Sequence, residues 1–228
     1  MKKLFTAIPF LLLVTCTYSQ QLSQVTFSGG SSLSYFSLVT DRNVLIRISV
    51  DGKIMEWGTE VQSLRSSNFY APNLQPYMGR VEYYGPESDS LSRGKVKSIG
   101  TANITYYGSY ETETKIGKTR SIGSLILDYY SDFDDKALKG KIKFIGNLVL
   151  QYYSSFDIDG FSGRLKAVGS NSISYYSSFE DKFIKGKIKS IGPLTYSWYT
   201  SLDIGRGVGL KSGSYRQKIG AVTYILGQ

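Results

Sequence analysis

Two basic residues and one tyrosine recur every 23 residues in the middle of this chain, in a pattern that could bind an anionic polymer. Cations supply charge attraction, while aromatic faces hold cations and stack against flat or apolar groups. If each repeat forms a pair of strands, period-two alternation brings these side chains together on the outward face of a sheet. The rows comprise Lys95, Lys97, Lys118, Arg120, Lys141, Lys143, Arg164, Lys166, Lys187 and Lys189, with Tyr107, Tyr130, Tyr153, Tyr176 and Tyr199.

The same rows have a simpler interpretation as the solvated face of a sheet. Lysine keeps such a face soluble and discourages edge-to-edge pairing, and tyrosine forms strands readily. The pattern alone does not choose between binding and solubility.

A carboxylate also recurs in every repeat, shortly after the tyrosine. Two carboxylates across a cleft are the minimum for glycoside hydrolysis, so a carbohydrate-active enzyme is one alternative. Because an acid stands in every repeat rather than at one unique place, we interpret these residues as turn formers and expect no catalytic residue. They are Glu111, Asp134, Asp157, Glu180 and Asp203.

The chain lacks histidine and has a single cysteine, Cys16. Cysteine–histidine and serine–histidine nucleophile pairs are therefore excluded, as is an imidazole acid or base. The usual ligands of transition metals are missing too. We expect no metal, no cofactor and no enzymatic activity.

Residues 1–19 have the layout of a secretory signal peptide: Lys2 and Lys3, an apolar run from Leu4 to Val14, then small and polar residues. We expect cleavage after Ser19 and export to the periplasm, the cell surface or the medium. The alternative is lipidation at Cys16, which ends a sequence resembling a lipoprotein cleavage box and would give peripheral membrane association.

The formal net charge of +9 favours acidic partners for an exported protein. The expected partners are an anionic glycan, lipopolysaccharide or another component of the cell envelope, and we expect no specific role in nucleic-acid binding. Net charge also serves solubility alone.

Each repeat alternates apolar and polar residues at a period of two, which predicts half-buried strands. Leu148, Leu150 and Tyr152 would share the buried face of one strand. We expect that face to continue four residues beyond the tyrosines, at Phe133, Phe156 and Phe179.

A shorter strand, such as Gly140–Lys143, precedes the longer one, and a glycine between them predicts a tight hairpin turn. Keeping Ile142 and Leu150 on the same face requires an odd number of loop residues or a β-bulge. The fold class is therefore all-β, an antiparallel meander of hairpin repeats forming a curved sheet, open or rolled. We divide the chain into the signal peptide (1–19), a degenerate hairpin region (20–93), five repeats (94–208) and a capping strand (209–228).

The period and the Tyr-x-x-x-Phe spacing followed by glycine resemble the MORN-type repeat. Tyr152, Phe156 and Gly163 carry this spacing in one copy. The resemblance covers about half the chain and implies a scaffolding or attachment role, with no catalytic residue. The sequence thus favours an exported, non-enzymatic binding or attachment protein, with an enzyme or a self-assembling surface subunit as alternatives.

Overall fold

A computed structural model describes residues 20–40, 42–61, 73–157, 160–203 and 205–227. The predicted signal peptide and Cys16 lie outside these residues. Every regular element of the described chain is a β-strand, and none of its segments forms an apolar helix long enough to cross a membrane.

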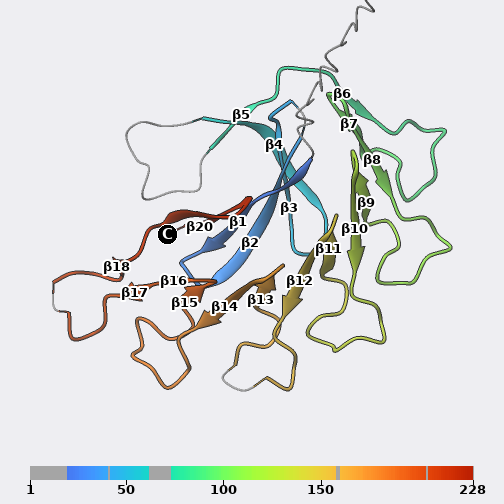
Figure 1. Ribbon diagram of the computed structural model, residues 1–228. Coiled ribbons are helices and arrows are strands. Elements are labelled where there is room, and N and C mark those ends of the chain that lie inside the picture. Colours follow the sequence, from blue (N-terminus) through green and yellow to red (C-terminus); the bar gives the residue numbers. More distant parts are fainter. Residues whose placement is uncertain (1–19, 41, 62–72, 158–159, 204, 228) are drawn as a thin grey trace, which may run out of the picture.

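The chain forms two large sheets and one small one (Figure 1). A seven-stranded sheet has the order β19-β20-β1-β2-β3-β4-β5, in which only β1 and β20 pair in parallel. Its strands are β1 (Gln21–Ser28), β2 (Ser32–Val39), β3 (Leu45–Ile48), β4 (Ile54–Glu60), β5 (Leu74–Pro76), β19 (Arg216–Ile219) and β20 (Val222–Leu226). The C-terminal strands therefore join the N-terminal ones instead of extending the repeats.

The repeats form an eleven-stranded antiparallel meander, β6 to β16 in sequence order. Its strands are β6 (Val81–Tyr83), β7 (Val96–Ile99), β8 (Ala102–Tyr106), β9 (Thr119–Ile122), β10 (Leu125–Tyr129), β11 (Ile142–Ile145), β12 (Leu148–Tyr152), β13 (Leu165–Val168), β14 (Asn171–Tyr175), β15 (Ile188–Ile191) and β16 (Leu194–Thr195). A short pair, β17 (Ser197–Trp198) and β18 (Leu210–Ser212), follows. The predicted fold class is confirmed, and the sheet is open.

A β-bulge recurs in the first strand of each repeat. Tyr129 pairs with Ile142, whereas the preceding Asp128 pairs with Phe144, so Lys143 is the extra residue. The bulge lets Ile142 and Ile145, three residues apart, both point into the core, where each is at most 1% exposed. Of the two solutions that the sequence leaves open, the structure adopts the bulge.

The hairpin turn between the two strands of a repeat is two residues long. Ile145 pairs with Leu148 across Gly146 and Asn147. Gly146 has a φ of +57°, as the first central residue of a type II′ turn requires.

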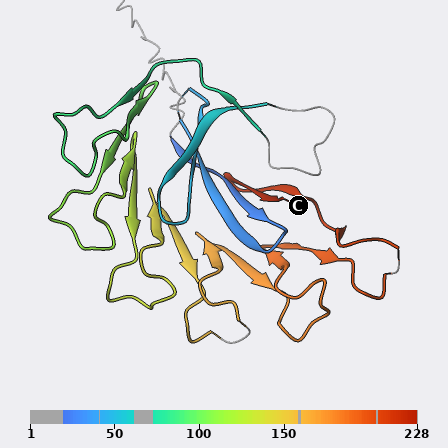
Figure 2. The ribbon, with the colours of Figure 1, turned by 180° about the vertical axis from the view of Figure 1, so that it is seen from behind.

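One continuous core lies between the two large sheets. It joins Phe27, Phe36 and Ile46 of the seven-stranded sheet to the inward isoleucines, leucines and tyrosines of the repeats. Backbone bonds also connect the sheets: the amide of Ile142 donates to the carbonyl of Val50 at 2.9 Å. Figures 1 and 2 show the repeat sheet curving around one side of the other, with its long loops radiating outward in an arc.

The prediction that Phe133, Phe156 and Phe179 extend the core is wrong, because their side chains are almost fully exposed. The strand ends at the tyrosine, and the chain then turns outward into the long loop. Period-two alternation cannot be carried beyond the end of a strand.

Replacement of Gly146 by alanine tests the turn. The left-handed φ is unfavourable for a residue with a Cβ, and that Cβ would lie 3.0 Å from Cδ2 of Leu125. We expect Gly146→Ala to lower the free energy of unfolding by about 1 to 2 kcal/mol in urea denaturation. Gly108→Ala is the control, since a Cβ there meets open space without a left-handed φ. Equal effects of the two changes would contradict the assignment.

Candidate functional site

The first basic residue of each repeat ties its repeat to the next part of the fold. Lys95 Nζ donates to the carbonyl of Gly117 at 2.5 Å, and Arg164 Nη1 donates to that of Gly186 at the same distance. Lys118 and Lys141 bind Gly140 and Gly163 in the same way. In the last copy the array meets the other sheet, and Lys187 donates to the carbonyl of Gly29 at 3.0 Å.

These five cations, which we call the inner row, also lie over the rings of core aromatic residues. Lys95 Nζ is 4.7 Å from the ring centre of Tyr106, and Lys187 Nζ is 4.4 Å from that of Trp198. Burial lowers the pKa of all four lysines of the row. The inner row comprises Lys95, Lys118, Lys141, Arg164 and Lys187. Each of these cations contacts both a carbonyl and an aromatic ring, so it has few hydrogen-bonding positions left for a ligand.

The first tyrosine of each repeat anchors the core. The hydroxyl of Tyr129 donates to the carbonyl of Thr119, ten residues earlier, at 2.6 Å. Tyr175 and Trp198 bind Leu165 and Ile188 at the same spacing.

The second tyrosine of each of the first four repeats reaches the following repeat. The hydroxyl of Tyr130 donates to the carbonyl of Leu150, twenty residues later, at 2.9 Å. Its ring packs edge-to-face on Tyr152 with the centres 6.0 Å apart. The same carbonyl bond is made by Tyr84, Tyr107, Tyr153 and Tyr176.

These contacts change the predicted binding face. Tyr107 and Tyr130, expected in solvent, are each only 8% exposed, and Tyr153 and Tyr176 are half-buried. Adjacent side chains of a strand point to opposite faces, so the tyrosine doublet predicts one ring inward and one outward, and it does not reveal the bond to the next repeat. The second tyrosines therefore serve chiefly as ties between repeats.

The second basic residue of each repeat stands on the outward face and forms what we call the outer row. These residues are Lys97, Arg120, Lys143, Lys166 and Lys189, and each is exposed or half-buried. Lys143 Nζ lies 5.1 Å from the ring centre of Tyr130, and Lys166 Nζ lies 4.9 Å from that of Tyr153. Arg120 and Lys189 take corresponding places over Tyr107 and Tyr176.

Loop carboxylates compensate part of the outer row, since Lys143 interacts electrostatically with Asp134. Lys166 forms an ion pair with Asp157 at 3.3 Å. Within the described residues, the other four cations of the row have no carboxylate oxygen within 4.0 Å. The row is therefore one line of cations, about 9 to 10 Å apart at two strand spacings per repeat. Tyrosine rings lie beneath four of the five cations.

Three of the five recurring acids stabilise the turns of their long loops. Asp134 Oδ2 accepts bonds from the amide and the hydroxyl of Ser131, at 2.6 and 2.8 Å. Asp157 and Asp203 accept the same pair of bonds from Ser154 and Thr200. The Ser154 bonds lower the pKa of the Asp157 carboxyl. The bond from Lys211, followed by those from Thr200, lowers the pKa of Asp203 to about 2. Such ionised, bonded carboxylates suit turn formation better than general acid catalysis.

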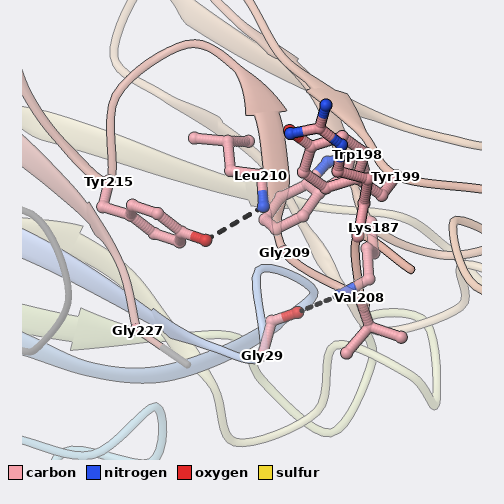
Figure 3. A pocket seen from close by; sticks show the side chains of 10 residues that line it. Gly29, Lys187, Trp198, Tyr199, Val208, Gly209, Leu210, Tyr215 and Gly227 are labelled. Atoms are coloured by element: carbon pink, nitrogen blue, oxygen red, sulfur yellow. Dashed lines mark hydrogen bonds between the residues drawn. The ribbon is translucent and has the colours of Figure 1, made fainter. Parts of the chain in front are cut away.

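Tyr199, the last of the predicted tyrosines, borders a cavity. The cavity has a volume of about 570 Å³ and lies where the repeat pattern breaks (Figure 3). Trp198, Tyr215 and Leu210 supply apolar surface, and Arg206 supplies an exposed cation. Lys187 also reaches it, but its amine already binds Gly29. The sequence did not single out this cavity, because its walls come from segments far apart in the chain.

The described residues contain no cluster of three acidic, histidine or cysteine side chains suited to a metal ion. No family model matches the chain, and no curated protein or solved structure is similar to it at a significant level. The resemblance to the MORN-type repeat stays a prediction.

The division of the basic residues into two rows can be tested with the neighbours Lys141 and Lys143. Lys141→Gln removes a charge-assisted bond to Gly163 and should lower the free energy of unfolding by about 1 to 2 kcal/mol. Lys143→Gln makes the same charge change on the outward face and should alter it by less than about 0.5 kcal/mol. Urea denaturation of both variants gives the comparison, and equal values would refute the division.

The buried tyrosines predict a loss of stability at high pH. Burial raises the pKa of Tyr106 and Tyr196 to about 12, and it raises those of Tyr129, Tyr152 and Tyr175 as well. Unfolded tyrosine ionises near pH 10, so above that pH the unfolded chain binds fewer protons and stability falls. The lowered lysine pKa values act in the opposite direction up to about pH 10.5.

We therefore expect a steep fall in the urea midpoint between about pH 10.5 and 12, accompanied by phenolate absorbance appearing on unfolding. Phenolate absorbance that develops fully while the protein is still folded would show that the tyrosines are not buried.

Proposed function

We propose that the protein is an exported, non-enzymatic binding or attachment protein of the cell envelope that holds an anionic polymer on its outer row. The observation that supports this most strongly is the sorting of the cations. One cation of every pair donates to a backbone carbonyl. The other stays on the outward face, where Lys166 alone forms a direct ion pair among the described residues.

The geometry suits a polymer better than a small anion. Charges on the outer row repeat once per hairpin along one direction of the sheet. One polymer can therefore contact several cations at once, and each contact increases the affinity. Hydroxyl pairs lie on the same face, such as Thr105 with Ser121 and Ser174 with Ser190, both at 2.6 Å between oxygens. An acidic polysaccharide or lipopolysaccharide offers both charges and hydroxyl groups to such a face.

The positions of the recurring acids agree with a role in attachment that involves no catalysis. A carbohydrate-active enzyme would need one unique pair of carboxylates facing a cleft. Here the acids recur in the loops, and Asp134, Asp157 and Asp203 hold the backbone of their own turns. The enzyme alternative has no observation in its favour.

Binding to polygalacturonate across a salt series tests the proposal. The variant Arg120→Gln/Lys143→Gln/Lys189→Gln should bind about tenfold or more weakly, if each lost contact contributes about 0.5 to 1 kcal/mol. Wild-type binding should weaken as salt rises, because exposed charges are screened.

The matched control is Lys136→Gln/Lys182→Gln/Lys185→Gln, which makes the same charge change on exposed loop lysines. It should retain most of the binding. The proposal fails if the outer-row variant binds like the wild type, or if neither polygalacturonate nor lipopolysaccharide is bound at low salt.

A further inference from the structure

A second regular row lies at the tips of the long loops. One large apolar residue per repeat stands there in solvent, at the 23-residue period. The relative exposures are 103% for Tyr110, 97% for Phe133, 89% for Phe156, 90% for Phe179 and 87% for Leu202. We call these five residues the rim row. Single exposed apolar residues are common, but five at one position of a repeat form a surface.

The rim row is held in place by the turns beneath it. The turn carrying Phe156 is closed by Asp157, which accepts bonds from Ser154. It is also tied to the preceding loop, because the amide of Ser155 donates to Asp135 Oδ1 at 3.0 Å. The hydroxyl of Ser155 donates to Asp135 Oδ2 at 2.5 Å. Ser201 and Asp181 make the same pair of contacts beside Leu202. The apolar side chains thus project from turns that hydrogen bonds hold in place.

The charge around the rim row is opposite to that of the outer row. The loop segments 108–116, 131–139, 154–162, 177–185 and 200–208 contain ten acidic and six basic residues, whereas the chain as a whole has a net charge of +9. An acidic residue directly follows each rim residue. An anionic partner would therefore be repelled here and drawn to the outer row.

We propose that the rim row binds an uncharged polysaccharide. A sugar ring has an apolar C–H face that packs on an aromatic or aliphatic side chain, and its hydroxyls donate to carboxylates such as Glu111 and Glu180, which are exposed. A chain of sugars presents these groups at intervals, as the rim row does. Together with the outer row, this would let one molecule connect a neutral polymer to an acidic one.

Two other partners fit the rim row less well. The loops radiate in an arc (Figures 1 and 2), so their tips cannot all meet a flat membrane, and their net negative charge opposes binding to anionic lipids. A second copy of the chain could offer its own rim row, but the two rows would carry the same net negative charge and repel each other. Ile126 lies at another exposed apolar position, which stays apolar in only one further copy: the half-buried Val149 replaces it in the next repeat, and Ser172 and Thr195 replace it in the last two.

The test is retention by insoluble cellulose, a β-1,3-glucan and a mannan at high salt. Phe133→Ala/Phe156→Ala/Phe179→Ala should reduce affinity at least tenfold for the polysaccharide that the wild type binds, with an unchanged urea midpoint because the rings are exposed. The control Met55→Ala/Tyr83→Ala/Ile126→Ala removes three exposed apolar side chains outside the rim row and should bind normally.

The outer-row variant Arg120→Gln/Lys143→Gln/Lys189→Gln should also retain this binding, which separates the two surfaces. The proposal is overturned if none of the three polysaccharides is bound, or if the phenylalanine variant binds as well as the wild type. It is also overturned if those phenylalanines instead control self-association in sedimentation velocity or binding to vesicles of phosphatidylcholine and phosphatidylglycerol.

Discussion

The arrangement of every repeat depends on one extra residue in its first strand. The bulge at Lys143 and its equivalents lets two apolar residues three positions apart both enter the core. Without it, a strand of this sequence would turn either Ile142 or Ile145 into solvent. The same bulge leaves the second basic residue on the outward face. Core packing and the outer row are therefore consequences of one backbone feature, repeated along the sheet.

Hydrogen bonds between repeats then decide which polar side chains are free. Lys141 and Tyr130 both donate to carbonyls of the next repeat, so neither is fully available to a partner. In a repeat array each unit is stabilised mainly by its neighbours, and here side chains as well as strand pairing provide that coupling. What remains outside is an outer row of cations and a rim row of apolar side chains, with opposite local charge. This separation is the basis of our proposal that the protein connects two chemically different polymers.

Much of the fold could be predicted from the sequence, because a period of 23 residues with period-two alternation requires hairpins. Leu150 and Tyr152 are buried as expected. The position of Phe156 could not be predicted by extending the strand, since the turn closed by Asp157 redirects the chain just before it. The roles of Lys141 and Lys143 also looked alike, because sequence alternation does not reveal bonds that run sideways to the next repeat. The cavity beside Tyr199 depends on distant segments and has no local signal.

Lysine acylation measured by mass spectrometry, with and without polygalacturonate, tests the central claim most directly. The inner-row amines of Lys95, Lys118, Lys141 and Lys187 should react slowly, because their bonds to carbonyls and their partial burial hinder attack. We expect this hindrance to outweigh the larger share of neutral amine that their lowered pKa values give. The outer-row lysines should react faster in the free protein and become protected by the polymer. They are Lys97, Lys143, Lys166 and Lys189. Equal reactivity of the two rows, or protection confined to the loop lysines, would contradict the account.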